Sequence, residues 1–244
     1  MPVAVIIPAR YDSTRFPGKP LYPLKGKPLI QHVYENSKKS RLAEEVMVAT
    51  DSETIFERVL AFGGKAVMTD KNHPSGTDRI AEVAASLDYD IIVNVQGDEP
   101  LIRPEMIDDV IMALDDTRAS IGTLIKKIED PGEIVDYNVV KVVFDRQMFA
   151  VYFSRATIPF RAHHSEVRRP EYYKHIGIYS YRRDVLLSIA GMEPTELENI
   201  EKLEQLRALE NGMKIKVKET FLETFGVDTP EDLERVEKCL SISS

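Results

Sequence analysis

Short apolar runs recur along this chain, and each is followed by a stretch in which apolar residues have helical spacing. The first run is Val3–Ile7, and Val46–Ala49, Lys65–Met68 and Ile91–Val95 continue the series. The longer runs do not alternate apolar with polar residues, as is expected of strands that are buried on both faces. Strands that alternate with helices over short links form a mostly parallel sheet with helices on both faces. The sequence therefore predicts an α/β, Rossmann-like fold.

Helix signals lie between and after these runs. Asp51 and Ser52 can cap a helix that carries Ile55 and Val59, and Gly63-Gly64 ends it. Five further helices are predicted at Pro28–Tyr34, Arg79–Leu87, Met106–Leu114, Thr195–Asn211 and Pro230–Leu240.

Beyond Ile121 the regular rhythm of strands and helices changes. Strand-like runs are predicted at Val139–Phe144, Phe149–Phe153, Ile176–Tyr181 and Ile215–Val217. The first two are joined by a short polar link that is typical of a hairpin. No internal repeat or linker divides the chain, so we expect a single domain over residues 1–244. Within it, residues 137–182 are predicted to form a smaller mixed lobe or a dimerisation arm.

Composition excludes several classes of protein. The chain has 32 basic and 40 acidic residues, a net charge of -8, which repels nucleic-acid backbones. Its single cysteine, Cys239, cannot form an intramolecular disulfide. No apolar run approaches the roughly 20 residues of a membrane helix, and the start lacks a signal-peptide pattern. We therefore expect a cytoplasmic enzyme that binds neither nucleic acid nor membrane.

The loop after the first strand is strongly basic. Between Arg10 and Lys27 there are five cations and one acid, Asp12, although the chain as a whole is acidic. Two prolines and a glycine restrict the backbone around Lys19, which lowers the entropic cost of fixing that side chain. Ligands of α/β sheets bind at the carboxyl ends of strands, where this loop lies. Arginine and lysine both bind phosphate oxygens, so the loop is predicted to hold a triphosphate.

Two aspartates are candidate metal ligands. Asp98 follows the strand Ile91–Val95, and Asp228 comes before Thr229, which can cap the last helix and so leaves Asp228 free. Mg²⁺ is commonly bound by few carboxylates together with phosphate oxygens and water. The residues alone leave an alternative, in which both aspartates only support a turn or a cap.

Glu204 is a candidate for a substrate-binding residue. At about 100° per residue it falls on the apolar face of its predicted helix, between Leu197 and Ile200. A carboxylate in such a position needs a partner or a ligand. Two alternatives follow, a role in a binding pocket or an internal salt bridge to Arg155 or Arg207.

Seven stretches, in order over nearly the whole chain, form a specific set. They are Ile6–Pro20, His73–Arg79, Asn94–Pro100, Tyr152–Pro159, His175–Tyr179, Glu201–Arg207 and Gly226–Leu233. This set resembles the bacterial 3-deoxy-manno-octulosonate cytidylyltransferases, also called CMP-Kdo synthetases. The resemblance implies the nucleotide-diphospho-sugar transferase fold, a Mg²⁺ requirement and a homodimer. It also implies the reaction of CTP with 3-deoxy-D-manno-octulosonate (Kdo) to give CMP-Kdo and pyrophosphate, which activates Kdo for lipopolysaccharide biosynthesis.

The resemblance also implies a role for individual residues. Those implied for catalysis are Arg10, Lys19, Asp98 and Asp228, of which the two aspartates hold the metal. Those implied for nucleotide binding are Ala9, Arg10, Lys19, Ser75, Gly76 and Arg79. Those implied for sugar binding are Gln96, His175, Tyr179, Glu204 and Gln205. Arg15 and Arg155 bind either the sugar carboxylate or the departing phosphates, and the sequence does not separate these roles.

Other functions stay open at this point. A cytidylyltransferase for an 8-amino Kdo analogue or for a sialic acid is the nearest, although Gln96–Pro100 and Tyr152–Pro159 favour Kdo over sialic acid. A sugar-1-phosphate nucleotidyltransferase usually has a longer glycine-rich opening, which this chain lacks. A non-catalytic nucleotide-binding regulator is disfavoured because Lys19, Asp98 and Asp228 are all present.

Overall fold

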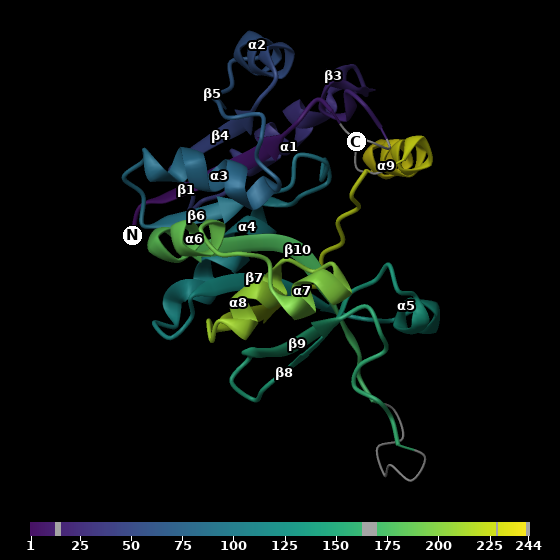
Figure 1. Ribbon diagram of the computed structural model, residues 1–244. Coiled ribbons are helices and arrows are strands. Elements are labelled where there is room, and N and C mark those ends of the chain that lie inside the picture. Colours follow the sequence, from purple (N-terminus) through teal and green to yellow (C-terminus); the bar gives the residue numbers. More distant parts are fainter. Residues whose placement is uncertain (13–15, 163–169, 228, 243–244) are drawn as a thin grey trace.

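A computed structural model describes residues 1–12, 16–162, 170–227 and 229–242. Its strands are β1 (Val3–Ala9), β2 (Pro23–Leu24), β3 (Lys27–Pro28), β4 (Glu45–Thr50), β5 (Ala66–Met68), β6 (Ile91–Asn94), β7 (Ile121–Lys127), β8 (Lys141–Phe144), β9 (Ala150–Ser154), β10 (Tyr173–Arg182) and β11 (Ile215–Glu219). Nine of them form one sheet in the order β11-β7-β10-β6-β1-β4-β5, in which β8 also pairs with β10 and β9 pairs with β8. The strands β2 and β3 form a separate ribbon (Figure 1).

The predicted buried strands lie at the centre of this sheet. β1 pairs in parallel with both β4 and β6, and Val5 lies opposite Val46 on one side and Val93 on the other. All three valines are at most 2% exposed, because helices cover both faces of the sheet. The predicted α/β fold with a mostly parallel sheet is confirmed.

One central strand departs from the parallel order of the sheet. β10 runs antiparallel to both of its neighbours, β6 and β7. No strand was predicted over β7, where a glycine, a threonine and two lysines interrupt the apolar run. Gly122 is needed there because a Cβ atom would lie 2.7 Å from the carbonyl oxygen of Val110, on the helix that packs against this strand. This residue therefore reflects close packing, although it weakens the strand signal.

Helices cover both faces of the sheet. They are α1 (Leu29–Ser37), α2 (Glu53–Ala61), α3 (Gly76–Ala85), α4 (Pro104–Met112), α5 (Pro131–Val135), α6 (Arg183–Ala190), α7 (Glu196–Glu201), α8 (Gln205–Glu210) and α9 (Pro230–Ile242), with short 3₁₀ turns η1 (Lys19–Leu21) and η2 (Ala113–Asp115). One apolar cluster joins β1 to α1, α2, α4 and α9, and a second on the opposite face joins it to α3, α6 and α8. Successive residues of β1 alternate between the two clusters, as the pleat of a strand requires. No helix in the described ranges has the length and apolar character that a membrane crossing requires.

The single helix predicted over Thr195–Asn211 is wrong. α7 ends at Glu201, Lys202 adopts the left-handed conformation with φ 55°, and α8 begins at Gln205. The carboxylate of Glu201 accepts hydrogen bonds from the Ser154 hydroxyl (2.6 Å) and the Arg155 backbone N–H (2.9 Å). These contacts attach the end of α7 to β9, so tertiary structure stabilises a break that the local sequence does not signal.

The segment predicted as a smaller lobe has two parts. β8 and β9 form an antiparallel hairpin that projects from the layered core (Figure 1). β10, in contrast, lies within the central sheet. Residues 137–182 therefore combine a projecting hairpin with a strand of the main sheet.

Candidate active site

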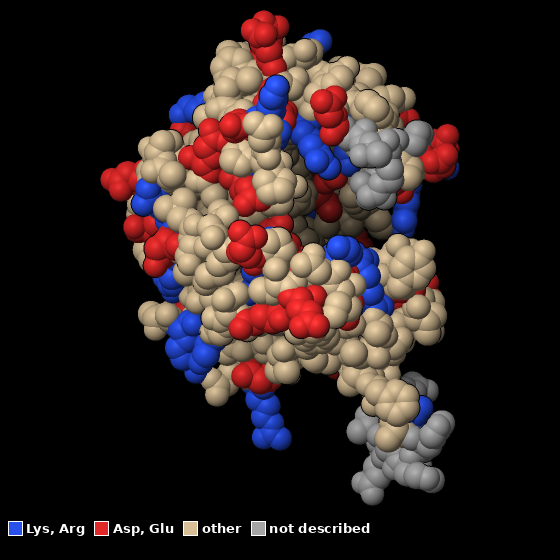
Figure 2. Space-filling model, viewed as in Figure 1, with Lys and Arg blue, Asp and Glu red and all other residues tan. Residues whose placement is uncertain are grey.

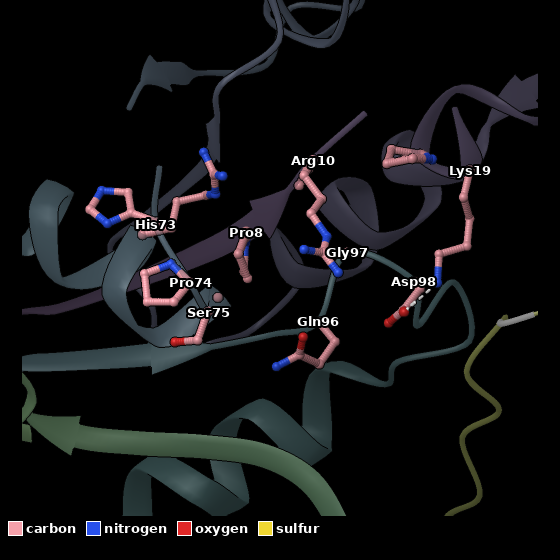
Figure 3. Close-up of a pocket in the computed structure, with 13 residues that line it drawn as sticks. Pro8, Arg10, Lys19, His73, Pro74, Ser75, Gln96, Gly97 and Asp98 are labelled. Atoms are coloured by element: carbon pink, nitrogen blue, oxygen red, sulfur yellow. Dashed lines mark hydrogen bonds and ion pairs between the residues drawn. The ribbon is translucent and has the colours of Figure 1, made fainter. Parts of the chain in front are cut away.

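A cavity of about 340 Å³ opens at the carboxyl ends of β1 and β6. Three segments wall it, namely the loop after β1, the approach to α3 and the loop after β6 (Figure 3). Its lining residues are Pro8, Ala9, Arg10, Lys19, Pro20, His73, Pro74, Ser75, Gly76, Arg79, Gln96, Gly97 and Asp98. All six predicted nucleotide-binding residues are among them, and we call this space the nucleotide cavity. The face drawn in Figure 2 is hollowed, with Lys and Arg side chains along the rims of the hollow.

Two glycines allow the walls of the nucleotide cavity to approach one another. A Cβ atom at Gly97 would lie 2.6 Å from the carbonyl oxygen of Pro8, so the loop after β6 can pass the end of β1 only with glycine there. At Gly76, a Cβ atom would lie 3.3 Å from Cγ of Pro8. The first turn of α3 and the loop after β6 are therefore both held against Pro8.

The basic loop after β1 is closed by its own backbone. Gly18 has φ 71°, donates its N–H to the carbonyl of Tyr11 (2.9 Å) and accepts from the N–H of Leu21 (2.9 Å). This closure places Lys19 at the start of η1, from which its side chain enters the nucleotide cavity. Arg10 also extends into the cavity (Figure 3). Arg15, predicted to bind sugar or phosphate, lies outside the described residues.

Lys19 and Asp98 form an ion pair in the cavity. The Lys19 Nζ lies 2.6 Å from Oδ2 of Asp98, and the side chains are 12% and 31% exposed (Figure 3). The cation predicted to bind phosphate and the carboxylate predicted to bind metal are thus adjacent. Asp228, the second predicted metal ligand, lies outside the described residues. The residue before it, Val227, is fully buried and donates its N–H to the carbonyl of Asp98 (2.9 Å).

The start of α3 is fixed by a cap and by an arginine. The Ser75 hydroxyl accepts from the N–H of Asp78 (3.2 Å) and donates to its carboxylate (2.7 Å). One turn further, Arg79 is only 3% exposed, and its Nη2 donates to Oδ2 of Asp51 (2.8 Å). The helix therefore presents Ser75, Gly76 and Arg79 to the nucleotide cavity in a fixed arrangement.

A second cavity, of about 140 Å³, adjoins the first. It is lined by Thr77, Asn94, Gln96, Ile121, Tyr179, Tyr181, Ile189, Glu204, Gln205 and Ala208. Gln96 lines both cavities, so the two spaces meet at its side chain. Four predicted sugar-binding residues are brought together here, and we call this space the inner cavity.

Glu204 lines the inner cavity, but not for the reason inferred from helical spacing. Ile200, its supposed neighbour on an apolar face, is 68% exposed, because the break at Lys202 separates the two residues. Burial raises the pKa of the Glu204 carboxyl, although the hydroxyls of Thr77 and Ser75 and the charge of Arg207 act in the opposite direction. The ionised carboxylate is therefore poorly solvated and favours a ligand that donates hydrogen bonds.

The neighbours of Glu204 leave it available to a ligand. Arg207, one of its two possible partners, instead forms a bidentate pair with Glu198 at 2.7 and 2.8 Å. Gln205 is 9% exposed, and its buried Nε2 has no hydrogen-bond partner among the described residues. A buried donor without a partner is costly, so the inner cavity favours a polar molecule that accepts this hydrogen bond.

His175 supports the inner cavity from behind. Its ring packs against Phe153 (centroids 5.1 Å apart) and Tyr179 (5.3 Å), and Nε2 lies 2.9 Å from the Thr123 hydroxyl. Burial lowers the pKa of His175 to about 3, so the ring is neutral. Burial and the nearby Glu204 raise the pKa of Tyr179, which keeps its proton. His175 contacts Tyr179 but lines a different cavity, between β10 and the segment that leads to α9.

Arg155 lies apart from both cavities. Its Nε donates to the carbonyl of Glu201 (2.9 Å) and its Nη1 to the carbonyl of Tyr137 (3.1 Å). It forms no ion pair with Glu204, so neither predicted salt bridge of Glu204 is present among the described residues. In this arrangement Arg155 helps to hold the break between α7 and α8.

Three polar lining residues of the inner cavity were not predicted as site residues, namely Thr77, Asn94 and Tyr181. Asn94 carries a usable signal, since a polar residue that is 2% exposed ends a buried apolar strand. Thr77 follows Gly76 in a stretch already singled out. Tyr181 gives no local signal, because only the placement of β10 beside β6 brings it to the cavity.

Several known proteins are similar to this chain over most of its length. A sequence model of the family described as Cytidylyltransferase matches residues 4–215. The 3-deoxy-manno-octulosonate cytidylyltransferase of Thermodesulfovibrio yellowstonii is 53% identical, over 98% of both chains. That of Geotalea uraniireducens is 55% identical, over 97% of this chain and 98% of the relative.

Solved structures extend the likeness to the fold. A CMP:2-keto-3-deoxy-manno-octonic acid synthetase complexed with CTP superposes with a TM-score of 0.94 and 42% identity, over all of both chains. A cytidylyltransferase from Leptospira borgpetersenii, 20% identical over 99% of this chain and 87% of its own, shares the fold with a TM-score of 0.66. The fold class predicted from the resemblance is confirmed.

Proposed function

This chain belongs to the 3-deoxy-manno-octulosonate cytidylyltransferase family, and we infer its function from that membership. It joins CTP to Kdo, giving CMP-Kdo and pyrophosphate, and so activates Kdo for lipopolysaccharide biosynthesis. The observation that carries the mechanism is the junction of the two cavities at Gln96. A nucleotide on one side and a sugar on the other meet at this side chain.

The reaction transfers a nucleotidyl group between them. The anomeric hydroxyl of the sugar attacks the α-phosphorus, the new P–O bond forms, and the bond to the pyrophosphate oxygen breaks. Such transfers depend on positioning and on neutralising charge rather than on protein-derived intermediates. In our proposal Arg10 and Lys19 hold the triphosphate and neutralise the departing pyrophosphate. Both line the nucleotide cavity, and the backbone of the loop restricts Lys19.

The base is proposed to lie against the first turn of α3. Cytosine presents acceptors at O2 and N3, which match the N–H donors of an arginine such as Arg79. Ser75 and Gly76 offer backbone groups in the same wall, and Ala9 continues it at the end of β1. This arrangement accounts for a preference for CTP, because uracil has a donor at N3.

Asp98 and Asp228 are proposed to hold Mg²⁺. The donor set fits this ion, since Mg²⁺ takes one or two carboxylates with phosphate oxygens and water. The Asp98 carboxylate is partly exposed to the nucleotide cavity, and the backbone next to Asp228 is bonded to the Asp98 loop through Val227. When bound, Mg²⁺ neutralises triphosphate charge. With Asp98 engaged by the ion, Lys19, now paired with Asp98, would be available to a phosphate oxygen.

The inner cavity is proposed to hold the sugar. Glu204 accepts hydrogen bonds from sugar hydroxyls, and the unpartnered Nε2 of Gln205 donates one. Gln96 and Tyr179 contact the sugar from the opposite wall, and His175 holds Tyr179 in place. Arg15 is proposed to bind the sugar carboxylate or the departing phosphates. Arg155 could take the same role only by leaving the carbonyls of Glu201 and Tyr137.

Pyrophosphate release, measured with each of four nucleoside triphosphates and several acceptors, tests this function. We expect the highest kcat/KM with CTP and Kdo, and little release with sialic acid or a sugar 1-phosphate. The 8-amino Kdo analogue is the informative competitor, because Glu204 can pair with an ammonium as well as with a hydroxyl. Faster turnover with that analogue would reassign the sugar, and release that needs no acid sugar would refute the mechanism.

A homodimer is proposed on the side of α5. Val135, Tyr137 and Phe160 are 75%, 69% and 81% exposed, and the Thr157 hydroxyl donates to the Ile134 carbonyl (2.9 Å), which connects the two stretches. Clustered exposed apolar side chains commonly mark an interface. We expect light scattering to give the mass of two chains and Tyr137→Asp with Phe160→Asp to halve it. An unchanged mass in that variant would exclude this surface.

We also propose that the protein acts in the cytoplasm, where CTP is made and kept. Cell fractionation followed by the pyrophosphate assay should recover the activity with cytoplasmic marker enzymes. Recovery with the membrane fraction would contradict the proposal.

A further inference from the structure

Arg79 is held from the side that faces away from the nucleotide cavity. Its Nη2 donates to Oδ2 of Asp51 at 2.8 Å, and its Nη1 donates to the Thr69 hydroxyl and, at 3.5 Å, to the carbonyl of Asp70. Asp51 directly follows β4, and Thr69 directly follows β5. Arg79 lines the nucleotide cavity, whereas the described lining residues include neither Asp51 nor Thr69. The guanidinium is thus anchored by groups behind the substrate.

The pair of Arg79 and Asp51 is well shielded from solvent. The two side chains are 4% and 17% exposed. In such surroundings an ion pair is little screened, and removing the carboxylate leaves the buried guanidinium with only the neutral acceptors at Thr69 and Asp70. The guanidinium then has to turn toward another acceptor or toward water. Its direction is therefore set by Asp51 more than by its own helix.

A guanidinium in a fixed direction can select a pyrimidine. It carries five N–H donors, and the three contacts behind Arg79 engage three of them at most. The remaining donors match the O2 and N3 acceptors of cytosine. In uracil N3 carries a hydrogen, so a guanidinium N–H would face another donor there. A guanidinium that turns freely tolerates both bases, because it can withdraw from the N3–H of uracil. Selection therefore depends on how firmly the group is held.

We propose that Asp51 is a positioning residue for nucleotide selection, which fixes the donors of Arg79 so that the site accepts CTP and rejects UTP. This inference rests on the proposed function, in which Arg79 lies against the base. Asp51 does not contact the substrate and acts only through Arg79. It shares this task with Thr69, whose hydroxyl holds the second terminal nitrogen.

The test compares kcat/KM for CTP and for UTP, at saturating Kdo, in the full chain. Asp51→Asn keeps the shape but removes the charge, and we expect the CTP/UTP ratio to fall about tenfold or more, the size of a lost base-reading contact. The KM for CTP rises, and the KM for Kdo stays within about twofold. Asp51→Glu retains the charge, and we expect a smaller fall in its CTP/UTP ratio than in Asp51→Asn. An unchanged ratio in folded Asp51→Asn overturns the inference.

Asp108→Asn is a matched control for a purely structural effect. Asp108 is 3% exposed and accepts from the Ser40 hydroxyl (2.6 Å) and the Arg41 backbone N–H (3.0 Å), and it does not line the nucleotide cavity. Its loss is expected to lower the thermal midpoint and leave the CTP/UTP ratio unchanged. A fall in the ratio there as large as in Asp51→Asn would show that selectivity only follows stability, and would overturn the inference.

Two further variants keep the outcomes distinct. If Asp51→Asn does not fold, Thr69→Val removes only the second anchor, and a smaller fall in the ratio is expected. No fall in that variant then overturns the inference. Arg79→Gln distinguishes the place of Arg79 against the base from the role of Asp51. If it leaves the ratio unchanged, the proposed place of Arg79 against the base is wrong. If it lowers the ratio while Asp51→Asn does not, only the role of Asp51 is refuted.

Discussion

Replacing Glu204 by glutamine separates a substrate-binding carboxylate from a structural one. The substitution keeps the shape of the side chain and removes one acceptor and the charge. Glu204 lines the inner cavity and forms no ion pair with any described residue, since Arg207 is paired with Glu198 and Arg155 with backbone carbonyls. We therefore expect the variant to fold normally and to bind sugar poorly.

The expected magnitudes differ clearly between the two roles. A hydrogen bond to a charged group contributes about 1.5–3 kcal/mol, which corresponds to roughly 10- to 150-fold in binding. The kcat/KM for Kdo should fall by about that factor, while the KM for CTP stays almost unchanged. A broken buried ion pair instead costs about 3–5 kcal/mol of stability, or roughly 6–20 °C in thermal midpoint for a chain of this size.

The pH dependence of stability gives a second readout of the same residue. Burial raises the pKa of Glu204 above its ordinary value of 4.5. Between 4.5 and the raised pKa, the folded chain keeps a proton that the unfolded chain has lost. This contribution to stability is complete below 4.5 and is lost as the pH rises through the pKa of the folded state. Glutamine cannot titrate, so the variant should be at least as stable as the parent at neutral pH.

The assay combines pyrophosphate release at varied Kdo with thermal unfolding at acidic and neutral pH. Glu198→Gln is the matched control, because it breaks the buried bidentate pair with Arg207, whose side chains are 12% and 8% exposed. The control should lose thermal stability, and its affinity for Kdo should fall less than that of Glu204→Gln. If Glu204→Gln instead loses as much stability as Glu198→Gln, with unchanged sugar kinetics, the assignment of Glu204 to the sugar site is refuted.

Three further predictions concern single residues. Asp98→Asn is expected to lower kcat on the order of 100-fold without a fall in thermal midpoint, as for a lost metal ligand, and near-normal turnover at saturating Mg²⁺ would exclude Asp98 from the metal site. Lys19→Ala is expected to lower kcat as well as to raise the KM for CTP, whereas a change in KM alone would limit Lys19 to binding. His175, with a pKa of about 3, should show imidazole NMR signals that do not move between about pH 5 and 8, and a titration near its ordinary value would show that the ring is solvated.

Much of the fold follows from local sequence. β1, β4 and β6 consist of near-continuous apolar residues because they are buried on both faces, and such runs can be recognised without knowledge of their neighbours. The cap at Ser52 is equally local, since its hydroxyl accepts from the N–H of Ile55 three residues later. The carboxyl ends of parallel strands lie at one edge of the sheet, so the loop with Arg10 and Lys19 and the loop with Asp98 share that edge.

Other features depend on pairing between distant segments. The antiparallel insertion of β10 between β6 and β7 joins residues far apart in the chain, and it alone brings Tyr179 and Tyr181 to the inner cavity. Local periodicity contains no information on which strands become neighbours. The same holds for Asp51 and Arg79, which are 28 residues apart and meet only when β4 and α3 pack together.

Glu204 illustrates the division between sequence and tertiary structure. Its charge and its place near apolar residues indicated an unusual carboxylate, but the continuous helix used to orient it does not exist. The helix breaks at Lys202, which adopts the left-handed conformation although it is not a glycine. The contacts of Glu201 with β9 stabilise this break. Sequence thus indicated which residues are candidates for the chemistry. Tertiary structure decided where they point, because contacts between distant segments outweigh the small differences in local backbone energy.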